Sequence, residues 1–394
     1  MLIHMKANPG GQIDTNAVIG RSAVIELLWD TLEQQSIIKT AERRIGKTTI
    51  AKKMLAEPRP GWRPVLQDLE QYHSAMDFAM SVYREVHQFL SNRGKATRLA
   101  KALVQSIGGV EVGGVFKMPE MASAQWKDVL RTTISDLMNE RSEGDDRLVF
   151  LWDEMPFMLA NIRDREGAPT AMEVLDVLRA LRQDHPGLRM VITGSIGLHH
   201  VLGSLKKANY ANASVNDMLE IEVLPLESSD AVSLAMLLLE GEALVCAESA
   251  NVAEVIAHES DCFPFYIHHI VKGLKIAGGT VDSHRVREMV KHQLTDEKDP
   301  WELYHYRERI PIYYGDDAKT VLLILDDLAV RSESMSVADL LGALKNVSGF
   351  DDREALLSLL KLLVQDHYLS RDSNGAYQFR FPLIKRWWKI NRSL

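Results

Sequence analysis

The fold of this chain is decided by one run, Ser36-Ile37-Ile38-Lys39-Thr40-Ala41-Glu42-Arg43-Arg44-Ile45-Gly46-Lys47-Thr48-Thr49-Ile50. Its β-branched start predicts a short strand, and its Gly-Lys-Thr tripeptide stands where a tight loop passes into a helix. This is the pattern of a phosphate-binding loop, in which backbone N–H groups at the start of a helix cradle phosphate oxygens. In that interpretation Lys47 reaches the outer phosphates and the Thr48 hydroxyl binds Mg²⁺.

The start of the loop departs from the usual pattern G-x-x-x-x-G-K-[ST]. Ala41 replaces the first glycine, which leaves room for a phosphate but loses free access to positive φ. Glu42 opposes an anionic ligand unless an arginine neutralises it, and we expect Arg43 or Arg44 to do so. The other arginine is open to contact phosphates or a partner. The loop residues expected to bind a nucleotide are Ala41, Glu42, Arg43, Arg44, Ile45, Gly46, Lys47, Thr48 and Thr49.

A matching acidic strand follows later in the chain. The continuous apolar run from Arg147 to Trp152 is typical of a strand buried on both faces of a parallel sheet, and it ends in Asp153-Glu154. The carboxyl ends of parallel strands form one edge of the sheet, and carboxylates at that edge lie beside the phosphate-binding loop. Asp153 would hold Mg²⁺ and Glu154 would polarise the attacking water as general base. The alternative is an exposed Asp-Glu turn after a core strand.

Two hydroxyl residues end the next predicted strand, Leu188 to Ile192. We expect this strand to lie between the loop strand and the Asp153 strand. Thr193 or Ser195 could then contact the γ-phosphate or the attacking water, and Ser195 is included among the catalytic candidates. In the alternative interpretation Gly194 and Ser195 only form a turn.

The composition indicates a soluble, multidomain chain. Its 394 residues are 46% hydrophobic and 25% charged, and the formal net charge is −8. That charge disfavours a protein that binds nucleic acid over its whole surface, although five tail cations, Arg380, Lys385, Arg386, Lys389 and Arg392, could form a local patch. Two cysteines, the absence of an 18-residue apolar run and the lack of a signal peptide predict a cytoplasmic protein without membrane contact.

Strands alternating with helices predict a doubly wound, parallel α/β sheet. We expect a nucleotide-binding domain over residues 1–226 and a helical lid over 227–298. Residues 299–394 are expected to form an aromatic connector and a winged helix-turn-helix, with a hairpin turn at Asp372 to Gly375. The Gly-rich stretch from Gly108 to Gly114 is interpreted as a loop or small hairpin.

Other groupings indicate less. The third helix of the winged domain, Asp351 to Asp366, is leucine-rich and acidic at its start, which favours a protein contact over DNA. His199-His200, and Cys262 with His268-His269, match no zinc spacing, so we predict no metal site there.

The combined motifs resemble those of the STAND-type, archaeal-like P-loop ATPases, which are relatives of AAA+ proteins. The matching segments are Val18-Ile19-Gly20-Arg21, Glu42 to Thr49, Ile192 to Ser195, Phe263-Pro264-Phe265-Tyr266, His305 to Arg309 and Tyr377 to Trp388. The resemblance implies that Gly20, Arg21 and Pro264 also contact the nucleotide, and that ATP and Mg²⁺ are the cofactors. Phe263 departs from the family's small residue at that position. Arg163, Arg165 and Arg182 are candidates for an arginine that acts on a neighbouring subunit.

The resemblance predicts a switch ATPase, which couples ATP binding and slow hydrolysis to conformational change and assembly with itself or a protein partner. Two alternatives stay open. One is a DNA-binding AAA+ initiator or loader that uses the winged helix. The other is a non-hydrolysing scaffold with a degenerate P-loop (Walker A), suggested by Ala41 and Glu42.

Overall fold

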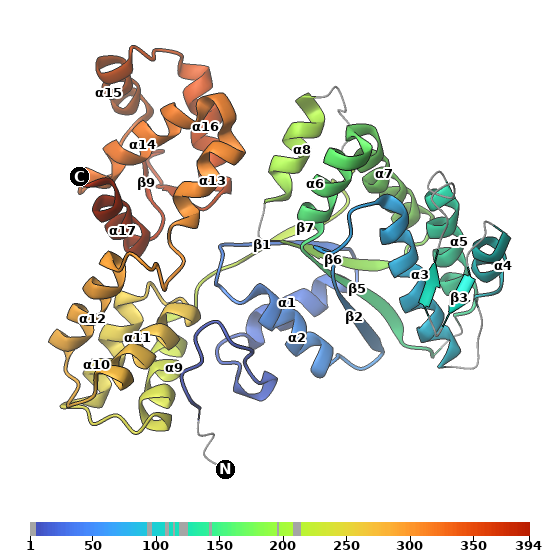
Figure 1. Cartoon of the computed structure of the whole chain (residues 1–394), viewed down its shortest axis with the longest axis horizontal. Coiled ribbons are helices and arrows are strands. Elements are labelled where there is room, and N and C mark those ends of the chain that lie inside the picture. Colours follow the sequence, from blue (N-terminus) through green and yellow to red (C-terminus); the bar gives the residue numbers. More distant parts are fainter. Residues whose placement is uncertain are drawn as a thin grey trace. The chain divides into compact units, whose positions relative to one another are not determined.

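The computed structural model describes residues 5–92, 97–106, 110–112, 115–117, 125–141, 144–194, 197–207 and 214–394. The chain forms two compact units (Figure 1). The sheet unit consists of residues 23–40 and 47–223, and the helical unit consists of residues 1–22, 41–46 and 224–394. Among the described residues, no helix has the length and hydropathy needed to span a bilayer. The prediction of three domains is not tested by this division.

The sheet unit is built on five strands in the order β2-β5-β6-β1-β7. Their bounds are Ile37–Ala41 for β1, Trp62–Asp68 for β2, Arg147–Asp153 for β5, Arg189–Thr193 for β6 and Leu219–Val223 for β7. β1 pairs with β6, β6 with β5, and β5 with β2, all in parallel. The predicted parallel sheet is therefore confirmed, and β6 lies between β1 and β5 as expected.

One helix precedes these strands and the others connect them, because parallel neighbours need a crossover. They are α1 (Ser22–Leu32), α2 (Lys47–Ala56), α3 (Ala75–Ser91), α4 (Arg98–Ser106), α5 (Trp126–Asn139), α6 (Met155–Glu166), α7 (Ala168–Asp184) and α8 (Leu198–Lys207). Figure 1 shows α1 and α2 on one face of the sheet and α3, α6 and α7 on the other. Phe150 and Trp152 of β5 join the core beneath α3 and α7, while Val149 and Leu151 are buried on the opposite face.

The described residues of the glycine-rich stretch belong to an antiparallel strand pair. β3 (Val110–Val112) pairs antiparallel with β4 (Val115–Lys117), which confirms the small hairpin that was one of two expectations. Its glycines lie outside the described residues. Helix α6 was not predicted, because its apolar residues directly follow the Asp153-Glu154 pair and carry a proline in the first turn.

The helical unit begins its long C-terminal part with four helices. They are α9 (Ser228–Gly241), α10 (Ser249–Glu259), α11 (Pro264–Ala277) and α12 (Ser283–Thr295). The sequence predicts helix starts at Ser229, about Asn251, Pro264 and Asp282. Each helix starts within two residues of its predicted position, since the starting signals are local. Asp282, for example, accepts a hydrogen bond from the Arg285 N–H and so caps α12.

The remaining elements are α13 (His305–Tyr314), a 3₁₀ turn (Gly315–Asp317), α14 (Ala318–Val330), α15 (Val337–Ser348), α16 (Arg353–Gln365), β8 (Leu369–Arg371), β9 (Tyr377–Phe379) and α17 (Pro382–Arg392). The order of three helices followed by an antiparallel hairpin agrees with the sequence prediction. Two helices were missed. The predicted connector contains α13, which carries an internal Pro311, and the basic tail forms α17.

Candidate functional site

The predicted phosphate-binding loop leads directly into α2, whose first residue is Lys47. Gly46 has φ of 103°, a conformation that glycine adopts at little cost. The backbone of the loop therefore favours glycine at this position. Ala41 instead closes β1 in extended conformation. The loss of the usual first glycine therefore causes no strain at this position.

Thr48 and Asp153, the two predicted Mg²⁺ ligands, are brought together in the sheet unit. The Thr48 hydroxyl donates a hydrogen bond to Asp153 Oδ2 at 2.7 Å, and the Glu154 N–H donates to Asp153 Oδ1 at 3.2 Å. Asp153 is only 6% exposed. A hydroxyl and a buried carboxylate supply the hard oxygen ligands that Mg²⁺ prefers, so this pair fits the ion.

Glu154 adopts the left-handed conformation, with φ of 55° and ψ of 29°. Such a conformation costs a non-glycine residue on the order of 1–3 kcal/mol and is concentrated at functional sites. Gly194 helps to accommodate it: a Cβ there would lie 2.7 Å from Pro156 Cδ and 3.4 Å from Glu154 Oε2. The ends of β5 and β6 can approach this closely only because residue 194 has no side chain.

Thr193 ends β6 and is 4% exposed. Its hydroxyl has no hydrogen-bond partner within the described part of the chain. A buried unpaired hydroxyl is unfavourable, so the position is suited to a group that the protein binds. Ser195, the other predicted hydroxyl, lies outside the described residues.

Lys39 is a residue that the sequence analysis did not select. It occupies a buried position of β1, in register with Thr193, and its Nζ donates to the backbone oxygen of Lys47 at 2.9 Å. Burial lowers the pKa of Lys39 to about 8, although the Asp153 carboxylate opposes that shift. Its signal in the sequence is a lysine at an inward position of an otherwise apolar strand.

Glu42 is neutralised within the helical unit, but not by a loop arginine as expected. Its carboxylate lies 3.5 Å from the guanidinium of Arg309 in α13, and it accepts the Arg43 backbone N–H at 2.7 Å. Burial raises the pKa of Glu42, but the cations, Arg309 foremost, outweigh burial and hold it below its ordinary value. Local sequence does not indicate this ion pair, because Arg309 is far from Glu42 in the chain.

Arg43 and Arg44 pair instead with Glu302, which precedes α13. Arg43 lies 3.3 Å from Glu302 Oε2, and Arg44 contacts Oε1. The Arg44 guanidinium also stacks over the Phe265 ring, 4.5 Å from its centroid. Phe265 follows Pro264 at the start of α11, so the predicted proline motif lies near the loop.

Arg21 supports the loop from the Gly20-Arg21 motif. Its guanidinium donates to the backbone oxygens of Ile45 and Leu224, each at 2.8 Å. Burial lowers its pKa to about 10. These contacts explain a loop-positioning role; direct contact of Gly20 or Arg21 with a nucleotide stays a prediction.

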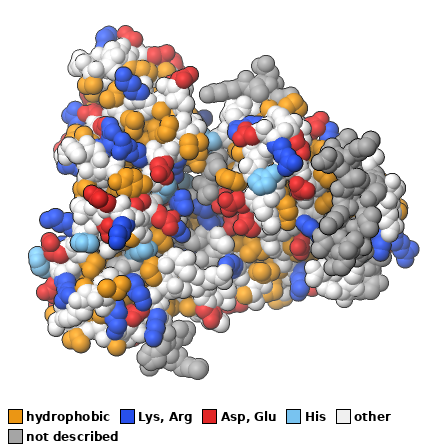
Figure 2. Space-filling view, viewed as in Figure 1, with side chains coloured by type: hydrophobic (Ala, Val, Ile, Leu, Met, Phe, Trp, Pro, Cys, Tyr) orange, Lys and Arg blue, Asp and Glu red, His pale blue; other side chains and the backbone are white. Residues whose placement is uncertain are grey.

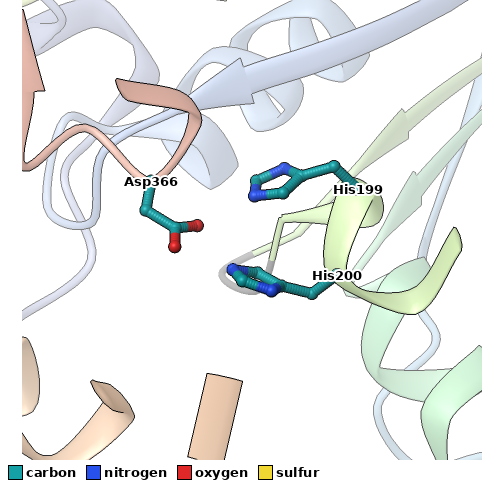
Figure 3. Close-up of side chains that lie close together, drawn as sticks. All are labelled: His199, His200 and Asp366. Atoms are coloured by element: carbon teal, nitrogen blue, oxygen red, sulfur yellow. The ribbon is translucent and has the colours of Figure 1, made fainter. Parts of the chain in front are cut away.

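The histidine groups have separate structural surroundings. His199 and His200 are consecutive in α8, with ring centroids 4.4 Å apart (Figure 3). Asp366, also labelled in Figure 3, belongs to the helical unit, where Tyr314 donates to it at 2.5 Å. His268 Nδ1 accepts the Asn8 N–H at 3.2 Å, and burial lowers its pKa to about 4.

One of the three arginine candidates is contradicted. Arg182 is 9% exposed and forms two hydrogen bonds with Asp217, at 2.7 and 2.8 Å. A buried, bidentate arginine is not available to a neighbouring subunit.

The fold resembles that of a known ATPase. No family model and no curated protein match the chain. A Walker-type ATPase of Pyrococcus abyssi has a TM-score of 0.62 at 15% identity, over 95% of this chain and 96% of that one. The ORC2 protein of Aeropyrum pernix in its ADPNP–ADP complexes has a TM-score of 0.48 at 12% identity, over 98% of this chain and 96% of that one. The chain therefore has the α/β fold of a P-loop NTPase, in agreement with its strand order.

Proposed function

We propose that this protein is an ATPase that binds Mg·ATP at the loop ending in Gly46-Lys47-Thr48. The observation that carries the proposal is the 2.7 Å hydrogen bond between Thr48 and the buried carboxylate of Asp153. Those side chains come from the start of α2 and the end of β5, which is how a P-loop NTPase assembles its metal site.

Each group would have a distinct role. Lys47 and the backbone N–H groups at the start of α2 would bind the phosphates, and Thr48 with Asp153 would hold Mg²⁺. When bound, Mg²⁺ would neutralise the charge that develops on the phosphate oxygens. Glu154 would accept a proton from the attacking water, and Thr193 or Ser195 would orient that water or the γ-phosphate.

We extend the proposal to a regulatory switch, in which the nucleotide state changes contacts with a protein partner or a second copy. The support is the contact of loop residues Glu42, Arg43 and Arg44 with Glu302 and Arg309. A loop whose side chains are held by a distant segment can transmit its occupancy to that segment.

Nucleotide binding and hydrolysis by three variants test this function. We expect Lys47→Ala to lose Mg·ATP affinity, and Glu154→Gln to retain binding but lose about 100-fold or more in turnover, as general-base loss typically does. Lys52→Ala, on the same helix, is the control and should leave both unchanged. A wild-type protein that neither binds nor hydrolyses ATP would refute the proposal.

The DNA-binding alternative has less support. Three cations of the basic tail are occupied: Arg386 pairs with Glu259 at 2.5 Å, Arg392 with Asp326 at 2.6 Å, and Lys385 donates to the Arg331 backbone oxygen. On the face seen in Figure 2, basic and acidic side chains of the described residues are interspersed. Salt-dependent DNA binding that weakens on changing Arg386 and Lys389 would nevertheless favour it.

The scaffold alternative loses part of its basis. Ala41 is in extended backbone, and Glu42 is paired with Arg309, so neither departure by itself prevents phosphate binding. An unchanged melting temperature with saturating Mg·ATP would favour a scaffold, because a ligand that binds only the native state must stabilise it.

A further inference from the structure

The loop arginines share one acidic partner. Glu302 is the carboxylate with which Arg43 and Arg44 both form ion pairs among the described residues. Arg44 and Glu302 are each in the left-handed conformation, with φ of 68° and 54°. Non-glycine residues rarely adopt this conformation, so the backbone on both sides of the contact is unusual.

The ion pair with Glu302 does not use all of the hydrogen-bond donors of Arg44. Its Nε is buried and has no hydrogen-bond partner within the described residues, while its guanidinium is fixed over the Phe265 ring. A guanidinium has five N–H donors, and its fork matches a phosphate as well as a carboxylate. The side chain is therefore oriented, only partly satisfied, and able to take a second anion.

Glu42 does not compete for these arginines through its ion pair. Its carboxylate lies against Arg309, which also donates to the Tyr368 hydroxyl at 2.8 Å and to the Asp366 backbone oxygen at 2.9 Å. The Arg43 and Arg44 side chains are thus left to Glu302. That carboxylate is 42% exposed, and the hydrogen bond from Arg44 contributes most to lowering its pKa.

We propose that Glu302 is an affinity-determining residue of the nucleotide site: its carboxylate occupies Arg43 and Arg44, and the phosphate chain of the nucleotide must displace it. This inference rests on the function proposed above. A polyphosphate carries more charge and more acceptor oxygens than a carboxylate, so the exchange is favourable when nucleotide is present.

Displacement of the Glu302 carboxylate by a nucleotide would not unfold the segment around Glu302. The carboxylate of Asp299 accepts the N–H groups of Leu303 and Tyr304, each at 2.8 Å, and so holds this turn by itself. Release of Glu302 would leave the turn intact while removing its ion pairs to the loop. The ion pair between Glu42 and Arg309 would still join the loop to α13.

The test is the dissociation constant of Mg·ADP, measured by titration calorimetry on the full chain. Glu302→Gln keeps the side-chain size and removes the charge, so we expect about three- to tenfold tighter binding, the range of a partly exposed ion pair. Glu302→Ala should change affinity in the same direction. Glu308→Gln, at an exposed position of α13, is the matched control and should bind like wild type.

A double-mutant cycle tests whether Glu302 acts through Arg44. Arg44→Gln should weaken Mg·ADP binding, and adding Glu302→Gln in that background should restore much less affinity than it adds to wild type. Equal or weaker binding by both Glu302 variants, with wild-type binding intact, would overturn the inference and leave the ATPase proposal standing. If wild type and all variants fail to bind, the proposed function itself is wrong.

Discussion

At the scale of single residues, β1 and β6 contain buried polar side chains that the stability of the fold does not require. Lys39 is buried with a backbone oxygen as its hydrogen-bond acceptor, and the Thr193 hydroxyl has no partner among the described residues. Replacing such groups by apolar side chains of similar shape is often neutral or stabilising. Their presence is better explained by a ligand than by stability.

Thr193→Val separates these two roles. The substitution removes only the unpaired hydroxyl, so we expect the free energy of unfolding to change by less than about 1 kcal/mol. ATP turnover should fall about tenfold or more, because a hydrogen bond to the phosphate or the water is lost. Urea denaturation and steady-state phosphate release measure the two effects.

The control is Thr133→Val. Thr133 of α5 is fully buried and its hydroxyl also lacks a partner within the described residues, but it lies within a helix rather than at the end of a strand of the sheet. It should leave turnover unchanged. Equal turnover by wild type and Thr193→Val would show that the Thr193 hydroxyl has no part in the reaction.

At the scale of elements, α17 shows how a basic segment can serve the fold. Asp326 of α14 accepts hydrogen bonds from Trp388 Nε1 and Arg392 Nε, each at 2.9 Å. Asp261, which follows α10, accepts the Leu383 N–H at 2.7 Å in the first turn of α17. The helix is thus held by carboxylates that local sequence does not reveal.

Asp261 predicts a pH dependence of stability. Burial raises its pKa to about 6, well above its ordinary value of 3.8. Between these values the folded state keeps a proton that the unfolded chain has released, so the unfolding free energy falls as pH rises from about 4 to 6. The loss would be at most about 3 kcal/mol, since a pKa shift of one unit corresponds to about 1.4 kcal/mol, and less in practice because the group is not fully buried.

Asp261→Asn keeps an oxygen for the Leu383 N–H and removes the titration. We expect the variant to be more stable than wild type at pH 7.5, with the difference shrinking as pH falls from about 6 and vanishing below about pH 4. Asp316→Asn, at an exposed position, should show no such trend. Urea denaturation across this range measures it, and a constant difference between the two proteins would contradict the prediction.

At the scale of the whole molecule, the helical unit contains segments far apart in sequence. Loop residues 41–46 group with residues 224–394, although they lie between β1 and α2 in the chain. Arg309 joins them, because it lies against Glu42, over the Tyr306 and Tyr368 rings, and on the Asp366 backbone.

Ligand removal should be visible in the stability of the full chain. We expect Mg·ATP at 100 times its dissociation constant to add about 2.7 kcal/mol to the native state and to raise the melting temperature by a few degrees. EDTA should reduce this shift, because Thr48 and Asp153 would lose the ion that links them to the phosphates. Differential scanning fluorimetry with and without EDTA measures both effects, and Lys47→Ala is the control that should show little shift.

Much of the framework follows from the sequence alone. The β-branched and apolar runs predicted β1, β5 and β6 at the centre of the sheet, and local capping signals predicted α9 to α12 within two residues. The Gly-Lys-Thr tripeptide and the Asp-Glu pair predicted which side chains meet at Thr48 and Asp153. These inferences succeed because periodicity, caps and turns depend on neighbouring residues, and because parallel strands bring their carboxyl ends to one edge.

Only the tertiary structure decided which charges meet. Arg309 rather than a loop arginine neutralises Glu42, Glu302 takes Arg43 and Arg44, and Lys39 points to the Lys47 backbone oxygen. A buried charge requires a partner, but any of many distant residues can supply it, and no local pattern selects one. The sequence by itself determined a P-loop fold and the pairing of Thr48 with Asp153, while long-range packing determined how the loop is held.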